Sequence, residues 1–234
     1  MHLFFQADFT EKSTLLCEEE THHAVKVLRL KQGAILQLTN GKGELFDLQL
    51  VDIQGKQAQV KLLQKVTAEP ANFCIHLAIA PTKNMERVEW LVEKLVEIGI
   101  QKISFVQCER SERKNLNLER LQKIAISALK QSLQTFLPTL YPLISFKEWI
   151  KKDFSANTQK FIAYLSETPA ELLQKKLQPN QNYVLLVGPE GDFSPQEVAL
   201  AQRQGFEVVS LGKNRLRTET AGLVACLTCQ IVTS

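Results

Sequence analysis

The second part of the chain alternates apolar strands with amphipathic helices, and this order constrains the fold more than any other feature. Stretches typical of buried strands occur at residues 73–80, 102–107, 160–165, 183–188 and 206–212. Helical periodicity lies between them, most clearly where Val88, Leu91, Val92, Leu95 and Val96 mark one face of a helix that Gly99 ends. Strands that alternate with helices form βαβ units, so the sequence predicts an α/β fold with a parallel sheet.

The first part of the chain has a different rhythm. Residues 34–66 contain three runs of alternating polarity, separated by the turns "NGKG" and "QGKQ", and Asn-Gly between such runs is a strong hairpin signal. Residues 21–30 before them predict a short helix, which Gly33 closes. The chain is therefore expected to have two domains, a small β-barrel-like domain over residues 1–68 and an α/β domain over residues 73–234, with a linker at 67–72.

Two polar loops follow neighbouring strands of the expected sheet. The stretch "VLLVGPEGDFSPQE" runs from a strand through Gly188, Glu190 and Gly191 to a helix, which Ser194 and Glu197 begin as a capping box. The stretch "VVSLGKNRLRTETAG" then places an Arg-Thr-Glu-Thr cluster before the apolar final helix at 221–232. Both loops lie at the carboxyl ends of parallel strands, where open α/β sheets bind ligands, so we expect them to line a cleft.

Several classes of function lack their usual residues. There is neither a G-x-x-x-x-G-K-[ST] nor a G-x-G-x-x-G pattern, and none of the four histidines lies near the two loops. Five widely spaced cysteines do not form a disulfide framework, and Cys226 and Cys229 read as core thiols because no second C-x-x-C completes a metal site. No long apolar run and no basic, apolar leader is present, so we expect a soluble cytosolic protein without a metal.

Basic residues gather in two stretches, one over residues 21–68 and another that begins at Arg110. Such patches suit a polyanion such as a nucleic acid, although a solvated surface shows the same pattern.

The two loops, in this order and at this spacing, resemble those of the bacterial 16S ribosomal RNA uridine-N3 methyltransferases, the RsmE family of the SPOUT class. The motifs are "GPEGDFSPQE" and "LGKNRLRTETA", and further matches occur at "HHAVKVLRLKQG", "KNMERVEWLVEKLVEIGI", "ERSER" and "QKIAISALKQS". The resemblance thus covers nearly the whole chain. It implies a C-terminal SPOUT domain with a parallel sheet and a trefoil knot, a PUA-like RNA-binding N-terminal domain, and a homodimer.

The resemblance also implies S-adenosyl-L-methionine as methyl donor and 16S rRNA or the small ribosomal subunit as substrate. The residues expected to hold the donor belong to the two loops: Gly188, Glu190, Gly191, Leu211, Gly212, Leu216, Arg217, Thr218 and Thr220. Basic residues are expected to position RNA phosphates: Lys26, Arg29, Lys83, Arg110 and Arg113.

Methylation at N3 of uridine requires loss of a weakly acidic proton and stabilisation of the charge that grows on the uracil oxygens. Arg217 is the candidate for stabilising that charge or a nearby phosphate. Glu219 is the candidate proton acceptor, or alternatively it orients Arg217; a pair that only braces the loop is equally compatible with the sequence.

Some positions depart from the family pattern. Asp192 stands where a second glycine is usual, Asn214 stands where an arginine is common, and "KQSLQ" at 130–134 lacks an arginine that many members carry. Asp tolerates a positive φ better than most residues, so donor binding is still expected. Two other functions stay open: a SPOUT enzyme that methylates another base or a ribose, and an RNA-binding protein with a vestigial donor site.

Overall fold

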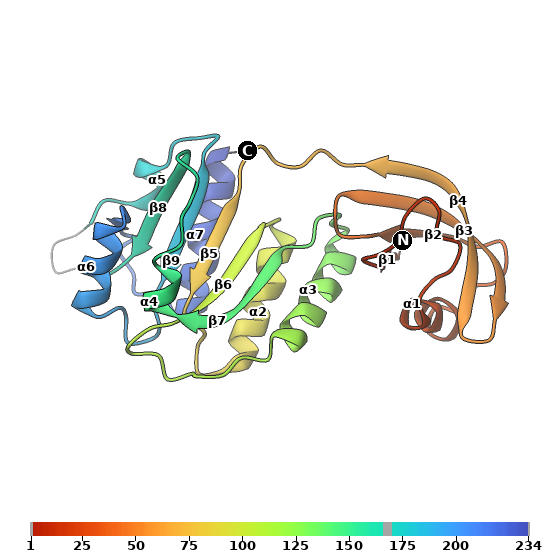
Figure 1. Ribbon diagram of the computed structural model, residues 1–234, viewed down its shortest axis with the longest axis horizontal. Helices are drawn as coiled ribbons and strands as arrows, with labels where there is room; N and C mark the ends of the chain where they lie inside the picture. The colour runs from red at the N-terminus through yellow and green to blue at the C-terminus, as the bar shows by residue number, and fades with distance from the viewer. Residues whose placement is uncertain (1, 166–169, 234) are drawn as a thin grey trace. The chain divides into compact units, whose positions relative to one another are not determined.

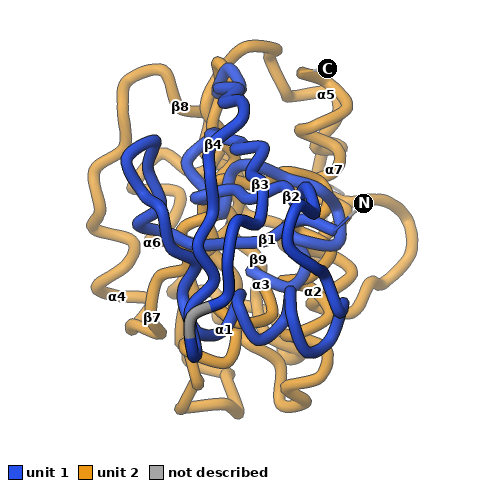
Figure 2. Tube along the Cα trace, turned by 90° about the vertical axis from the view of Figure 1, so that its right-hand side faces the viewer, with its two compact units in different colours: residues 1–70, 126–137 blue, residues 71–125, 138–234 orange. Residues whose placement is uncertain are grey.

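The computed structural model describes residues 2–165 and 170–233, and the chain forms two compact units (Figure 2). Residues 1–70 and 126–137 make up unit 1, and residues 71–125 and 138–234 make up unit 2. The sequence does not foresee that the short segment 126–137 belongs with the N-terminal residues.

Unit 1 is built on a four-stranded sheet in the order β1-β2-β3-β4. Its strands are β1 (Leu3–Phe5), β2 (Ile35–Thr39), β3 (Glu44–Gln54) and β4 (Gln57–Thr67) (Figure 1). The two predicted hairpins are confirmed, since β2–β3 and β3–β4 are antiparallel, whereas β1 was not predicted and pairs in parallel with β2. Alternate side chains of the sheet, among them Leu38, Phe46 and Leu48, form the core of this unit with Phe4 and Phe9.

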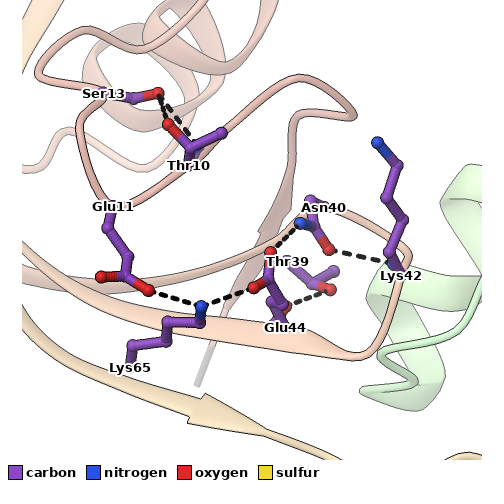
Figure 3. A network of polar contacts seen from close by, with 8 residues as sticks. All are labelled: Thr10, Glu11, Ser13, Thr39, Asn40, Lys42, Glu44 and Lys65. Carbon is purple, nitrogen blue, oxygen red and sulfur yellow. Dashed lines mark hydrogen bonds and ion pairs between the residues drawn. The ribbon is translucent and has the colours of Figure 1, made fainter.

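The Asn-Gly turn between β2 and β3 is fixed by polar side chains (Figure 3). Gly41 and Gly43 have φ of 75° and 91°, values that glycine adopts without strain. Asn40 Oδ1 accepts the Lys42 N–H at 2.9 Å, and Asn40 Nδ2 donates to Glu44 Oε2 at 2.5 Å. Lys65 Nζ lies 2.5 Å from Glu44 and 2.6 Å from Glu11, so β4 is tied to this turn.

The helix that precedes the sheet differs from the expected one at both ends. It begins earlier, as α1 (Glu18–His22), and continues through one π-helical turn, η1 (His23–Val27). Arg29 has a φ of 55°, and the Leu30 N–H reaches back to Ala24 O at 2.9 Å. Arg29 itself therefore reverses the chain and ends the helix before Gly33, which is why the predicted helix over 21–30 extends too far at its C-terminal end. The predicted start at residue 21 is also wrong, since α1 begins at Glu18.

Residues 126–137 complete unit 1. They comprise the last turns of α3 (Leu118–Ser132) and the segment that follows. Thr135 O accepts the Gly43 N–H at 2.9 Å, and a methyl group at Gly43 would overlap the ring of Phe136. Lys130 Nζ donates to both carboxylate oxygens of Glu20 at 2.7 and 3.0 Å, and Glu20 is buried. These contacts tie the segment to both the β2–β3 turn and α1.

Unit 2 contains a six-stranded, fully parallel sheet in the order β10-β8-β9-β5-β6-β7, as the alternation of strands and helices predicts. The strands are β5 (Ile75–Ile79), β6 (Lys102–Gln107), β7 (Thr139–Ser145), β8 (Thr158–Ala163), β9 (Asn182–Val187) and β10 (Glu207–Val209). Helix α2 (Met85–Glu97) follows β5 and buries the five predicted residues, and Gly99 ends it with a φ of 77°. The trefoil knot that the resemblance implies stays a prediction.

Helices cover both faces of this sheet. Helices α4 (Phe146–Trp149) and α6 (Pro195–Arg203) supply Phe146, Trp149, Val198 and Ala201 to one core cluster, and the predicted capping box of Ser194 and Glu197 is confirmed. Helix α7 (Thr218–Thr233) packs against α2, β5 and β9. Within the described residues, no helix combines the length and apolarity needed to cross a bilayer.

Three expectations for this unit need correction. Strand β7 and helix α4 were not predicted; β7 contains Pro142, and it lies at the edge of the sheet, where a strand tolerates proline. The stretch "PAELLQKKL" at 169–177 predicts a helix, but α5 covers only Leu173–Lys176, and residue 169 lies outside the described residues. The final helix is apolar on nearly every face, which predicts burial on several sides. Instead α7 buries one face, with Cys226 and Cys229 in the core as expected, and Leu227 and Ile231 on its other face are 39% and 67% exposed.

Gly222 sets the distance between α7 and the sheet. A Cβ atom there would lie 2.8 Å from Ile79 Cδ1 and 3.2 Å from Leu77 Cδ2. We expect Gly222→Val to lower the free energy of unfolding by ~2 kcal/mol, the usual cost of overpacking a core. Ile79→Val removes the clashing atom, so it should cost less in the Gly222→Val background than in the wild type. Urea denaturation of the four proteins measures this coupling, and strictly additive effects would contradict it.

Candidate active site

A cavity of about 410 Å³ opens at the carboxyl edge of the unit 2 sheet. Segments that follow β8, β9 and β10 form it, together with the start of α7. The two loops singled out in the sequence therefore do lie side by side and share one cavity. Seven of the predicted site residues line it: Gly188, Glu190, Leu211, Gly212, Leu216, Arg217 and Thr218.

Three other predicted residues lie beside the cavity and do not line it. Gly191 accepts a hydrogen bond from Arg110 Nη1 at 2.8 Å through its carbonyl oxygen. Thr220 is half-buried in the first turn of α7. Glu219 is 7% exposed, and its Oε1 lies 3.7 Å from Arg87 Nε. The charged partner of Glu219 is thus Arg87 and not the neighbouring Arg217.

The cavity also has walls that sequence reasoning missed. Ala163, Tyr164 and Leu165 follow β8, which lies between β9 and β10 in the sheet, and Arg87 comes from the first turn of α2. The strand order was the missing signal: once β8 is placed between β9 and β10, the segment after it must join the same edge. The other lining residues, none of which was predicted as a site residue, are Val187, Pro189, Asp192, Val209, Ser210, Asn214, Arg215 and Ala221.

The loop after β9 has a conformation that only certain residues permit. A Cβ atom at Gly188 would lie 3.0 Å from the ring of Phe193, so a side chain there would displace the loop. Asp192 has a φ of 62°, which confirms that a residue tolerant of positive φ is needed where the family usually has glycine. Its carboxylate accepts the N–H groups of Phe193 at 2.8 Å and Leu165 at 3.2 Å, while burial raises its pKa. Asp192 therefore joins the loops after β8 and β9.

Cationic side chains surround the rim and brace its loops. Arg113 donates to the carbonyl oxygens of Thr82, at 3.0 Å, and Lys83. The Lys83 N–H donates to Glu190 Oε1 at 3.1 Å, and Lys83 Nζ pairs with Glu112 at 2.9 Å. Three of the residues predicted to bind RNA, Lys83, Arg110 and Arg113, thus have contacts within this rim. The other two, Lys26 and Arg29, are exposed on unit 1.

The cavity has the size and lining of a site for a small organic ligand. Its volume is that of an ordinary ligand pocket, and apolar walls such as Val187, Leu211 and Leu216 alternate with polar groups such as Glu190, Ser210 and Thr218. Across the described ranges, no group of three His, Cys, Asp or Glu side chains is placed to hold a metal ion.

Comparisons with known proteins agree with this arrangement. A family described as an RNA methyltransferase domain matches residues 69–230, and one described as an RNA methyltransferase PUA domain matches residues 16–63. The ribosomal RNA small subunit methyltransferase E of Synechocystis sp. is 31% identical over 221 residues, which cover 92% of this chain and 72% of the relative. The protein of the same name from Buchnera aphidicola subsp. Acyrthosiphon pisum is 29% identical over 223 residues, 92% of this chain and 86% of the relative.

Solved structures give the same assignment. A probable rRNA-methyltransferase from Porphyromonas gingivalis has a TM-score of 0.91 and 41% identity, with 99% of each chain covered. A ribosomal RNA small subunit methyltransferase E from Neisseria gonorrhoeae, bound to S-adenosyl methionine, has a TM-score of 0.88 and 29% identity and covers 100% of this chain and 98% of its own. Family matches to both units and a relative at 31% identity together show that this chain belongs to the RNA methyltransferases of the ribosomal RNA small subunit methyltransferase E family.

Proposed function

We propose that this protein transfers the methyl group of S-adenosylmethionine to N3 of a uridine in 16S ribosomal RNA. The observation that carries the proposal is the shared cavity at the carboxyl edge of the sheet, formed by both motif loops in a chain of this family. The related protein from Neisseria gonorrhoeae is bound to S-adenosyl methionine, which supports this donor. Ribosomal RNA as substrate implies the cytoplasm as the site of action.

The residues that line the cavity fit the chemical groups of this donor. Apolar Val187, Leu211 and Leu216 suit an adenine ring, and Glu190 and Thr218 offer acceptors and donors for ribose hydroxyls. When bound, S-adenosylmethionine supplies an electrophilic methyl carbon. Gly191 and Thr220 do not line the cavity; we propose that they contribute to donor binding by fixing the conformation of the two loops.

Arg217 is the proposed stabiliser of the uracil. It lines the cavity and is exposed, so its guanidinium can reach a bound base. Loss of the N3 proton spreads negative charge over the uracil oxygens, and a fixed cation beside them favours the anion. For Glu219, burial behind the cavity wall and the contact with Arg87 support a role in orienting an arginine more than a role as proton acceptor.

RNA binding is proposed for the PUA-like unit 1 together with the cationic rim of the cavity. Lys26 and Arg29 are exposed beside the end of η1, where they can meet phosphates. A target base in structured RNA must unstack and flip out of the RNA before it can enter a pocket of this size.

A homodimer is proposed as the working form. The outward face of α7 leaves Leu227 and Ile231 exposed, and such a face on an otherwise buried helix suits a self-complementary interface. We expect sedimentation velocity to give twice the monomer mass for the wild type and a monomer for Leu227→Glu/Ile231→Glu. A wild type that sediments as a monomer at micromolar concentration would contradict this.

The proposed activity is tested by mass spectrometry of ribosomal RNA from a deletion strain. We expect loss of one N3-methyluridine from 16S rRNA and its return with the wild-type gene. Loss of a different methylated base or a ribose methylation would assign another SPOUT activity. An unchanged rRNA profile, together with no calorimetric signal for S-adenosylmethionine, would leave only an RNA-binding protein with a vestigial donor site.

A further inference from the structure

Arg87, which lines the cavity, forms an ion pair with Glu219, which lies behind the cavity wall. Arg87 comes from the first turn of α2 and Glu219 from the first turn of α7, two helices that pack against each other. The Nε atom of Arg87 lies 3.7 Å from Oε1 of Glu219. The pair therefore joins α2, the helix that follows β5, to α7, the helix that follows β10.

The two partners of this ion pair differ in burial, and Glu219 is the buried one. The Glu219 side chain is 8% exposed, and within the described residues its Oε2 atom is buried without a hydrogen-bond partner. An ionised carboxylate in such a place is costly unless a cation lies beside it. Arg87 supplies that cation, so the side chain of Glu219 restricts where the guanidinium can be.

The guanidinium also has an open side. The Arg87 side chain is 37% exposed, and Arg87 lines the cavity together with Arg217 and Thr218. Since Glu219 meets the Nε atom, the two terminal amino groups of Arg87 remain for other partners, and no other described residue provides one. A cation that is anchored on one side and open to a ligand pocket on the other is prepared to bind an anionic oxygen.

We propose that Arg87 binds, through its terminal amino groups, a negatively charged oxygen of the reacting pair, and that Glu219 is the positioning residue that holds it. The inference rests on the proposed function, which supplies two such oxygens: the carboxylate of the methyl donor, and a uracil oxygen as N3 loses its proton. Both are planar acceptors that suit a guanidinium.

Calorimetry separates the two oxygens. The proteins are the wild type, Arg87→Gln, Arg87→Lys and, as matched control, Arg120→Gln, which breaks the ion pair with Glu89 at 2.6 Å outside the cavity. The ligands are S-adenosylmethionine and methylthioadenosine, which lacks the amino-acid part. If Arg87 holds the carboxylate, Arg87→Gln weakens S-adenosylmethionine binding at least tenfold and leaves the affinity for methylthioadenosine within twofold of the wild type. The control Arg120→Gln leaves the affinities for both ligands within twofold.

The rate of single-turnover methylation at saturating donor tests whether Arg87 binds the uracil oxygen. If Arg87 acts on the uracil, donor affinity stays within twofold in Arg87→Gln, while the rate falls at least tenfold and its pH profile moves to higher pH, because the uracil anion is less stabilised. Arg87→Lys keeps the charge without the planar fork and should recover part of either loss.

The role of Glu219 is tested through Arg87. Glu219→Gln should produce the same kind of loss as Arg87→Gln, and the double variant should lose no more than Arg87→Gln alone. The double variant also removes the buried charge together with its partner, so it folds even if Arg87→Gln by itself does not.

Normal donor affinity and a normal rate profile in Arg87→Gln or in the double variant would overturn the inference while leaving the proposed function intact. A wild type that binds no S-adenosylmethionine would count against both.

Discussion

Arg217→Ala is expected to lower the single-turnover rate of methyl transfer to 16S rRNA by about 100-fold at saturating donor. Removal of one preorganised donor to a developing anion usually costs this much. Arg217 lines the cavity and is exposed, so its removal opens no void in the core and the melting temperature should stay unchanged. Arg217→Lys should retain part of the rate, since it keeps a cation but not two parallel hydrogen bonds.

The matched control for this variant is Lys213→Ala. Lys213 is an exposed cation in the same loop and does not line the cavity, so its rate should stay within threefold of the wild type. Rates are measured by transfer of a labelled methyl group to small ribosomal subunits. If Arg217→Ala retains more than a third of the wild-type rate, Arg217 does not stabilise the reacting base, and the charge must be met from another residue.

Lowering the pH from 7 to 4 is expected to reduce the free energy of unfolding of unit 2 by about 3 kcal/mol because of His76. This side chain on β5 is 8% exposed, and its Nε2 lies 2.8 Å from Ser104 Oγ. Its ring lies among those of Tyr141, Trp149 and Phe154. Burial, with a smaller effect of Lys102 and Lys152, lowers the pKa of His76 from 6.5 to about 4.

The sign follows from proton uptake. Between pH 6.5 and 4 the unfolded chain already carries the proton on His76, whereas the folded protein does not, so stability is highest above pH 6.5 and falls as the pH drops. Each unit of pKa difference corresponds to about 1.4 kcal/mol, which gives the expected size. Below pH 4 this contribution is constant.

Urea denaturation followed by tryptophan fluorescence measures this effect, because Trp149 lies 5.9 Å from His76 and reports on the same core. His76→Phe removes the titrating group and should abolish most of the pH dependence in this window. Glu44 and Glu148, whose pKa values are lowered from 4.5 by hydrogen bonds from Lys65 and Ser145, begin to lose stabilisation only near pH 4.5, at the acid end of this window. An equal slope in wild type and His76→Phe would assign the pH dependence to other groups.

Local patterns predicted most strands and helices of this fold, and they failed where tertiary contacts decide. The sequence pattern located α2 because its buried residues recur at helical spacing, and it located β6 because that strand is a short, continuous buried run. It missed β7, since Pro142 interrupts the strand signal and only an edge position makes it acceptable. It misplaced the end of the helix before β2, because a non-glycine residue, Arg29, takes the left-handed conformation there.

The candidate site was predicted in part for the same reason. Two loops could be assigned to one edge of the sheet from the direction of their strands alone. The loop after β8 could not, because that requires the order of strands in space. The contact between Arg87 and Glu219 depends on how α2 and α7 pack, and no local pattern carries that information.

Unit 1 consists of two separate segments of the chain, residues 1–70 and 126–137, and this affects how the protein folds as it is synthesised. A segment centred on Thr135 and Phe136 holds the β2–β3 turn, and Lys130 neutralises the buried Glu20. The N-terminal unit therefore cannot finish folding when its own sheet leaves the ribosome; it must wait until β5, α2, β6 and α3 have also emerged. Translation order and folding order differ in this protein, and a fragment cut at residue 70 would lack the side chains that close its fold.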